Sequence, residues 1–447
     1  MSQYEKVRFI GYAVPTTPAD IVAVGDPNGT GNVAGTYRAH DDIHADIATR
    51  GAALKNAVDT ARAALPDEET GVLNVFLAPE FYWHGPLGPY VHAPGEPDPG
   101  DLILEHLGKL FPTDEYPGFL LVLGTAISAE VADLGSLMSA PEVAVRNTIV
   151  RALGEGWRES DGPLALVIFD SLINFIKNCH AYPAVEVRNR AFVLGPGDLD
   201  GIDTEFGVRE LTTEKYFDSN EDLLLWDVTG KAVITEQMAA YPILDTSGGD
   251  FKKKPDDPHA LFRMRDEGGS AGPVVGVEIC LDHSDHRMRK AVARSPWPQR
   301  HDGLDLHLVP SCGMQLHPQS VAAHAGGWAF NCDGQYALGS ADQSGSPQTG
   351  TVGSVPCAYA DYVGAADPGY GAHTQLAWIA TGPRGANPPL SGSADAEFHP
   401  ALDVDVVVLP VTPGSGFDEC FAGGPGAVHI YGAAKPLPLR NPASTVV

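Results

Sequence analysis

Short apolar runs, each ending in a polar turn, constrain this chain more than any other feature. They include "VLNVFLAPEF" at 72–81, "GFLLVLGTAIS" at 118–128 and "GPVVGVEICLDH" at 272–283. Continuous apolar runs of this length predict strands buried on both faces. The polar residues that end them are where an α/β protein places its site.

Two longer segments have the apolar spacing of helices. In the segment 41–65, Ile43, Ile47 and Leu54 recur at intervals of four and seven residues, which places them on one helical face. The segment 100–111 has a similar apolar face. Helices alternating with buried strands predict an α/β fold in which the helices pack on sheets.

The second half of the chain continues this alternation. The segment 284–293 is expected to be helical, with Ser284 as a candidate N-cap. The apolar segments 304–314 and 403–411 are expected to be strands, and the alanine-rich segment 319–334 a helix. With no internal repeat or clear linker, we expect one domain over 1–447.

Composition narrows the class of protein. The chain has 447 residues, with 29 Lys and Arg against 57 Asp and Glu, so its net charge is −28. This charge repels phosphates and anionic lipids, so neither nucleic acid nor membrane is an expected partner.

No apolar run of about 18 residues appears, nor the apolar core of a signal peptide. The six cysteines form no CxxC pair. We therefore expect a cytoplasmic protein with reduced thiols.

Cys280 has three interpretations from its position alone. It ends an apolar run, as a small core residue would. With His283 and His286 it has metal-like spacing, although a tetrahedral site needs another ligand from elsewhere. It also precedes an expected helix N-terminus, where the helix dipole favours a nucleophilic thiolate. As a nucleophile it could form a Cys–His hydrolase pair with His283, but residues three apart across such a turn rarely face each other well.

Glu80 and Lys215 are the other candidates for chemistry. Glu80 ends the apolar run at 72–81 and precedes three aromatic residues, an environment that raises a carboxyl pKa toward that of a general base. Lys215 follows the strand-like "RNRAFVL" and adjoins an aromatic pair. Either could instead be an ordinary solvated residue.

In chain order, Glu80, Lys215 and Cys280 resemble the Glu-Lys-Cys triad of the nitrilase (carbon–nitrogen hydrolase) superfamily. "PEFYWHG" is similar to the family's Pro-Glu followed at a fixed distance by Gly, and "GVEICLD" to its Gly-Val-x-Ile-Cys-x-Asp. The resemblance covers about 7–345. Glu214 stands where the family has Tyr-Arg before the lysine, and the Phe-Pro-Glu that often follows the cysteine motif is missing.

The resemblance implies a four-layer α-β-β-α sandwich with large loop insertions near 128–186, 228–270 and 340–400. Its core would span about 6–345, and a C-terminal extension would complete it. Such proteins often form homodimers or larger homo-oligomers. The implied activity is hydrolysis of a small-molecule amide or nitrile, with no metal or other cofactor.

The resemblance also assigns roles to residues. Glu80 would be the base and Cys280 the nucleophile, while Lys215 and the backbone N–H of Leu281 would stabilise the oxyanion. Some relatives carry a second glutamate after the lysine, for which Glu221 is preferred over Asp222. The candidate pocket-lining residues are Tyr82, Trp83, His84, His283 and His286, although each could be ordinary packing.

Other functions stay open. The same thioester would support acyl transfer if an amine replaced water. A catalytically silent scaffold acting through its surface, or a Cys/His metal-binding protein, are alternatives from other classes.

Overall fold

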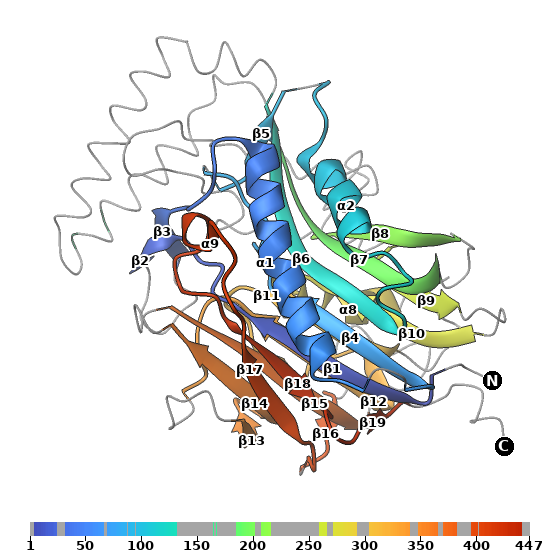
Figure 1. Ribbon diagram of the computed structural model, residues 1–447. Helices are drawn as coiled ribbons and strands as arrows, with labels where there is room; N and C mark the ends of the chain where they lie inside the picture. Colours follow the sequence, from blue (N-terminus) through green and yellow to red (C-terminus); the bar gives the residue numbers. More distant parts are fainter. Residues whose placement is uncertain are drawn as a thin grey trace, which may run out of the picture.

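The described part of the chain is mainly β-structure, as the computed structural model in Figure 1 shows. The described residues are 4–24, 32–66, 69–86, 88–93, 95–131, 164, 167, 185–201, 207–215, 259–265, 271–292, 304–339, 347–364, 370–381, 395–400 and 402–439. The strands are β1 (Lys6–Ala13), β2 (Ala19–Val24), β3 (Asn32–Thr36), β4 (Val72–Ala78), β5 (Tyr90–His92), β6 (Phe119–Val131), β7 (Val185–Gly201), β8 (Val208–Glu214), β9 (Leu261–Arg265), β10 (Ala271–Val277), β11 (Leu304–Ser311), β12 (Ala323–Asp333), β13 (Gln348–Val352), β14 (Val355–Val363), β15 (Gly371–Thr381), β16 (Glu397–Phe398), β17 (Val406–Pro410), β18 (Ala427–Tyr431) and β19 (Leu437–Pro438). The helices are α1 (Ile43–Ala63), α2 (Pro99–Leu110), α7 (Leu281–Ser284), α8 (Arg287–Val292) and α9 (Phe417–Cys420).

Seventeen of the described strands form one mixed sheet, and β2 pairs separately with β3. Strands β1, β4 and β6 run parallel, as do β10, β11 and β12. The long strand β7 joins these two groups, because it pairs antiparallel with β6 along most of its length and with β9 near its end. Strand β9 then pairs with β10, so hydrogen bonding is continuous from one group to the other.

The two parallel groups pack face to face across a buried apolar cluster. Phe9 of β1 contacts Phe330 of β12, with ring centroids 5.2 Å apart. Val75 of β4 and Val277 and Leu306 of the second group belong to the same cluster. The sheet therefore folds back on itself, and the strand ends of both groups come close together.

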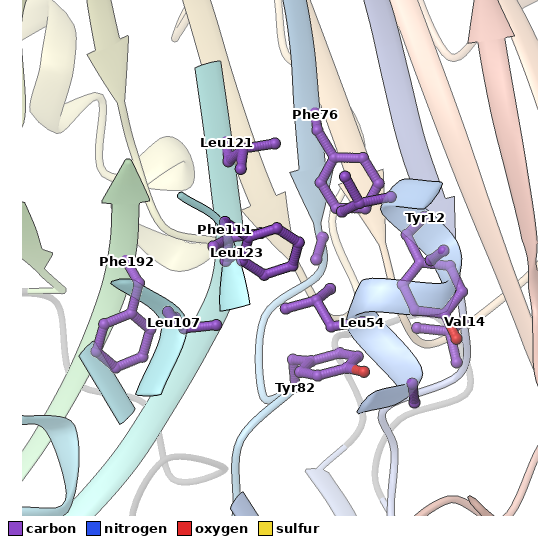
Figure 2. Close-up of a cluster of buried hydrophobic side chains, with 14 of the residues drawn as sticks. Tyr12, Val14, Leu54, Phe76, Tyr82, Leu107, Phe111, Leu121, Leu123 and Phe192 are labelled. Carbon is purple, nitrogen blue, oxygen red and sulfur yellow. The ribbon is translucent and has the colours of Figure 1, made fainter. Parts of the chain in front are cut away.

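Helices α1 and α2 cover the outer face of the β1–β4–β6 group (Figures 1 and 2). Asp42 caps α1 by accepting hydrogen bonds from the backbone N–H groups of His44 and Ala45. Leu54 of α1 packs with Phe76 of β4 in the cluster shown in Figure 2. No helix in the described residues has the length and apolarity needed to cross a membrane.

The predicted four-layer α-β-β-α sandwich is wrong. The structure has one large mixed sheet rather than two, and α1 and α2 are its only described helices of seven or more residues. Both lie on the same side of the sheet. On the outer face of the β10–β11–β12 group, Leu316, Val321 and Val355 pack on β11, β12 and β15, and Met288 of the short helix α8 packs on β10 and β11.

The alanine-rich segment 319–334 shows why the helical layers were overestimated. It contains strand β12, not the predicted helix. Trp328 and Phe330 point into the cluster between the two groups, while Ala329 faces the outer one. Because both faces of β12 are buried, its sequence has no polar alternation that would distinguish it from a helix.

The C-terminal segments belong to the same sheet. Strand β15 pairs with β12, and β18 pairs with β1, the outer strand of the β1–β4–β6 group. The expected strand at 403–411 is confirmed as β17, which pairs with β18. The region after 345 is thus an integral part of the sheet.

Candidate functional site

Glu80, Lys215 and Cys280 meet although 200 residues separate the first from the last. Each follows a strand end, namely those of β4, β8 and β10. Lys215 Nζ donates to Glu80 Oε1 over 2.9 Å, and the two side chains are only 2% and 0% exposed. The Cys280 thiol lies near enough to both groups for their charges to act on its pKa. The structure therefore brings together the three residues of the predicted triad.

The Cys280 thiol is buried and protonated in the resting site. Burial raises its pKa well above the usual range, and the negative charge of Glu80 raises it further. The ammonium of Lys215 acts in the opposite direction but does not reverse the shift. The thiol Sγ lies 3.8 Å from the carbonyl oxygen of Cys312. A thiol in this state needs a base before it can attack a substrate.

Backbone strain concentrates at the same place. Among described residues other than glycine, only Phe81, Cys280 and His286 have positive φ, at 57°, 44° and 58°. Phe81 follows Glu80, and Cys280 is the thiol residue itself. Conformations of this kind cost about 1–3 kcal/mol each and cluster at functional sites. A nucleophile on a tight strand-to-helix turn is a known way to present a reactive atom.

The Glu80 carboxylate has a further partner that the sequence interpretation missed. Asn189 of β7 donates its Nδ2 to Glu80 Oε1 over 2.9 Å. Thr16 Oγ1 donates to the Glu80 carbonyl oxygen over 2.7 Å. The ring of Phe81 lies 5.7 Å from Lys215 Nζ, within range of a cation–π contact. The sequence signal for Asn189 was an amide between Arg188 and Arg190 in an expected strand.

The aromatic residues after Glu80 lie in the core. Tyr82 packs against Tyr12 and Phe421 beneath α1, and its hydroxyl donates to the Arg50 carbonyl oxygen (Figure 2). Trp83 is also fully buried, and its Nε1 donates to the Leu123 carbonyl oxygen over 2.8 Å.

His84 is equally buried and lies beside Arg50, with its Nδ1 3.3 Å from Arg50 Nη2. Burial and the Arg50 charge hold the pKa of His84 well below its ordinary value. It therefore packs with the same α1 face as Tyr82 rather than beside Cys280.

The residues after Cys280 separate in space. Leu281 is the first residue of α7, so its backbone N–H has no partner within the helix. His283 Nδ1 contacts Glu278, and His286 Nδ1 contacts Ser320 Oγ, each over 2.8 Å. Cys280, His283 and His286 therefore do not converge as metal ligands. Glu221 and Asp222 lie outside the described residues.

Glu278, His283 and His307 are a second candidate metal centre, because their ligand atoms lie within 4.8 Å of one another. The hydrogen bonds at the ring nitrogens that face away from Glu278 exclude metal binding at this cluster. His283 Nε2 accepts the backbone N–H of His317, and His307 Nδ1 accepts that of Ala322. A neutral imidazole that accepts at one nitrogen carries its proton on the other. Both inward nitrogens are thus donors to Glu278 and have no lone pair for a metal.

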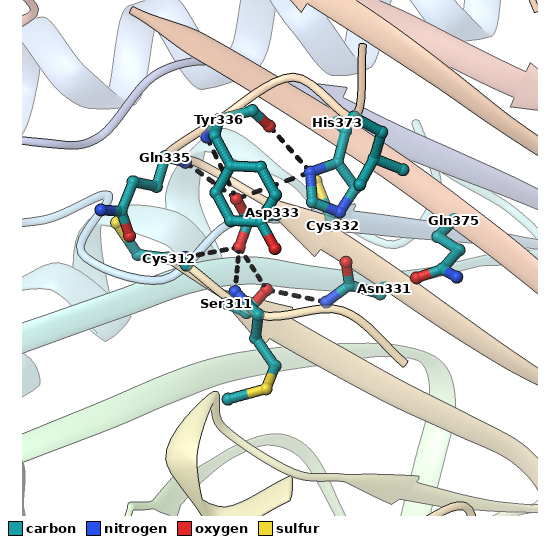
Figure 3. Close-up of polar contacts among 12 residues, drawn as sticks. Ser311, Cys312, Asn331, Cys332, Asp333, Gln335, Tyr336, His373 and Gln375 are labelled. Carbon is teal, nitrogen blue, oxygen red and sulfur yellow. Dashed lines mark hydrogen bonds and ion pairs between the residues drawn. The ribbon is translucent and has the colours of Figure 1, made fainter. Parts of the chain in front are cut away.

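Asp333 holds the loop that supplies the Cys312 carbonyl (Figure 3). Its carboxylate accepts the Ser311 hydroxyl and the backbone N–H groups of Gly313 and Met314 at 2.6–2.9 Å. It also accepts the N–H groups of Gln335 and Tyr336. One buried carboxylate therefore fixes two loops beside Cys280, and sequence analysis did not single it out.

Buried titratable groups predict a loss of stability in acid. Burial lowers the pKa of His283 to about 4 and that of His429 to about 3. Unfolded histidines bind protons near pH 6.5, so the unfolded chain gains protons first and stability falls as the pH drops from 6.5 to 4. Each histidine should contribute a loss of about 3 kcal/mol by pH 4. Urea denaturation at pH 7 and pH 4 measures the loss, and His429→Asn should lose less than the wild type. Equal losses in the two proteins would refute the contribution of His429.

Glu278 extends the same trend to lower pH. Its burial alone would raise the carboxyl pKa, but hydrogen bonds from His283 and His307 outweigh burial and lower it to about 2. The stabilisation from Glu278 is thus complete above pH 4.5 and is lost as the pH falls toward 2.

We compared the chain with protein-family models, curated proteins and solved structures. None of these three comparisons found a match.

Proposed function

We propose that this protein is a thiol hydrolase that cleaves non-peptide carbon–nitrogen bonds of a small amide or nitrile. The observation that carries the proposal is the buried Glu80–Lys215 ion pair beside the strained Cys280. A base, a cation and a nearby thiol are the three groups that acyl chemistry at a thiol requires. The nitrilase-like motifs around Glu80 and Cys280 support the same reaction, although the sandwich fold of that family is not present.

The first half of the proposed reaction forms a covalent intermediate. Glu80 takes the proton from the Cys280 thiol, and the thiolate attacks the amide or nitrile carbon. Lys215 and the backbone N–H of Leu281 stabilise the negative charge that develops on the substrate. With an amide, Glu80 returns the proton to the departing nitrogen, and the amine or ammonia leaves a thioester on Cys280. A nitrile instead gives a thioimidate, which loses ammonia after water adds.

The second half releases the product. Glu80 takes a proton from water, and the resulting hydroxide attacks the thioester carbon. The carbon–sulfur bond breaks, the thiolate recovers a proton from Glu80, and a carboxylic acid leaves. The resting thiol and carboxylate are then restored, so the cycle consumes only substrate and water.

A screen of small aliphatic and aromatic amides and nitriles for ammonia release tests the proposal. We expect at least one compound to release ammonia and to leave a mass adduct on the intact protein when the reaction is acid-quenched. The adduct should map to the peptide that contains Cys280. An adduct on another residue, or release that is independent of Cys280, would refute the proposed chemistry.

A further inference from the structure

Glu278 occupies the centre of a fully buried polar cluster beside the proposed nucleophile. Its Oε2 accepts His283 Nδ1 over 2.8 Å and His307 Nε2 over 2.9 Å. Its Oε1 accepts the backbone N–H of Met288 over 2.6 Å. These three donors come from α7, β11 and α8. One carboxylate thus connects the end of β10 to the three elements around it.

This cluster encloses the turn that carries Cys280. Glu278 lies two residues before Cys280 and His283 three residues after it, so their side-chain hydrogen bond closes the turn from both ends. The backbone adds the His283 N–H to Cys280 carbonyl bond over 2.8 Å. The Cys280 N–H donates to the Pro310 carbonyl on the neighbouring strand over 3.1 Å.

We propose that Glu278 is a positioning residue that holds the strained Cys280 turn and so aims the thiol at the substrate carbon. Cys280 has φ 44° and ψ −108°, a conformation that a residue with a side chain does not keep unaided. Contacts on both sides of the turn are therefore needed to offset its strain. This inference rests on the proposed function, in which the position of the thiol sets the rate.

The contacts at the outward-facing nitrogens of the two histidines determine which ring nitrogen carries the proton. Backbone N–H groups of His317 and Ala322 occupy the far nitrogens of His283 and His307, so both rings present protons to Glu278. An ionised carboxylate, which only accepts, fits three donors. A glutamine at 278 would point its amide group at one of these donors and leave that contact unmade. The negative charge is therefore required for the geometry.

His283 offers a matched pair of substitutions. In His283→Asn the side-chain amide nitrogen lies near the place of Nδ1 and can still donate to Glu278. In His283→Gln the amide oxygen lies near the place of Nε2, so the contact with the His317 N–H is kept and that with Glu278 is lost. Glu278→Gln removes the negative charge at the centre of the cluster.

Asp305 provides the control for burial alone. Asp305 of β11 is also a buried carboxylate that accepts a backbone N–H, from Val274 of β10, and contacts a histidine, His324 Nε2, each over 2.8 Å. Asp305→Asn should lower stability without disturbing the Cys280 turn. Unfolding in urea measures the stability of each variant.

The test combines amide hydrogen exchange over 278–288 with ammonia release from the compound that the screen identifies. Glu278→Gln and His283→Gln should exchange faster over 278–288 and lose 10- to 100-fold in kcat, with KM within about twofold of wild type. His283→Asn and Asp305→Asn should stay within about twofold of wild type in both measurements. If Glu278→Gln does not fold, the two His283 variants decide.

Three results would overturn the inference. The first is faster exchange in Glu278→Gln or His283→Gln with an unchanged kcat, which would show that the cluster holds the turn but that the turn does not set the rate. The second is an equal loss of kcat in Asp305→Asn, which would show a general effect of buried carboxylates. The third is wild-type exchange in Glu278→Gln, which would show that Glu278 does not hold the turn. Failure of the proposed function is distinct, because the wild type itself would then release no ammonia.

Discussion

Cys280→Ala should abolish turnover, with kcat lower by roughly 10⁴-fold or more. In the proposed reaction the thiol forms the bond to the substrate, while the Glu80–Lys215 ion pair supplies only a base and a cation. Ammonia release under saturating substrate measures the loss. Circular dichroism and urea denaturation should show a folded protein, because alanine removes one small buried atom group.

Cys312→Ala is the matched control. Cys312 lies beside Cys280 and contacts it through the backbone carbonyl, which alanine retains. This variant should keep kcat within a few-fold of wild type and still form the adduct on Cys280. If activity survives in Cys280→Ala but is lost in Cys312→Ala, the nucleophile is Cys312 and the proposal for Cys280 is wrong.

Glu80→Gln should separate turnover from the direct reactivity of the thiol. Removing the base should lower kcat by about 10²- to 10⁴-fold. Removing the negative charge should at the same time lower the pKa of Cys280, because Glu80 raises it and Lys215 lowers it. Alkylation of Cys280 by iodoacetamide should therefore rise at a lower pH than in wild type, while ammonia release falls.

The pH profile of alkylation and the rate of ammonia release check the two effects independently. Lys215→Met is the opposite variant, in which loss of the cation should move alkylation to higher pH. Glutamine can still accept from Asn189, which limits distortion of the strand end. An alkylation profile that moves to higher pH in Glu80→Gln would contradict the electrostatic account of this site.

The apolar runs predicted the strands and their ends well. Strands β4, β6 and β10 and helix α1 lie where the pattern placed them, because runs buried on both faces and a one-sided helical stripe are local signals. The layer architecture was wrong because it depends on pairing between distant strands. No local pattern shows that β7 pairs with both β6 and β9 and so joins the sheet into one.

The candidate site was predictable where polar residues ended apolar runs. Glu80 and Cys280 were found in this way. Lys215 was found because it lies between them in the sequence. Asn189 and Asp333 were not, because a polar residue inside a buried strand has the same sequence signature as an ordinary satisfied core group. Conversely, Tyr82 was expected at the rim because it follows Glu80, yet the turn at Phe81 directs it toward α1.

The positive φ angles of Phe81 and Cys280 have a consequence for engineering this chain. Glycine adopts such angles freely, but it also gives the unfolded chain more freedom, and both native side chains are buried. Glycine at position 81 would relieve the backbone strain and at the same time remove a buried ring near Lys215, and the loss of that ring costs more than the strain. Strain relief and side-chain packing therefore oppose each other at these two backbone positions, and a library designed for heat resistance should keep both residues unchanged.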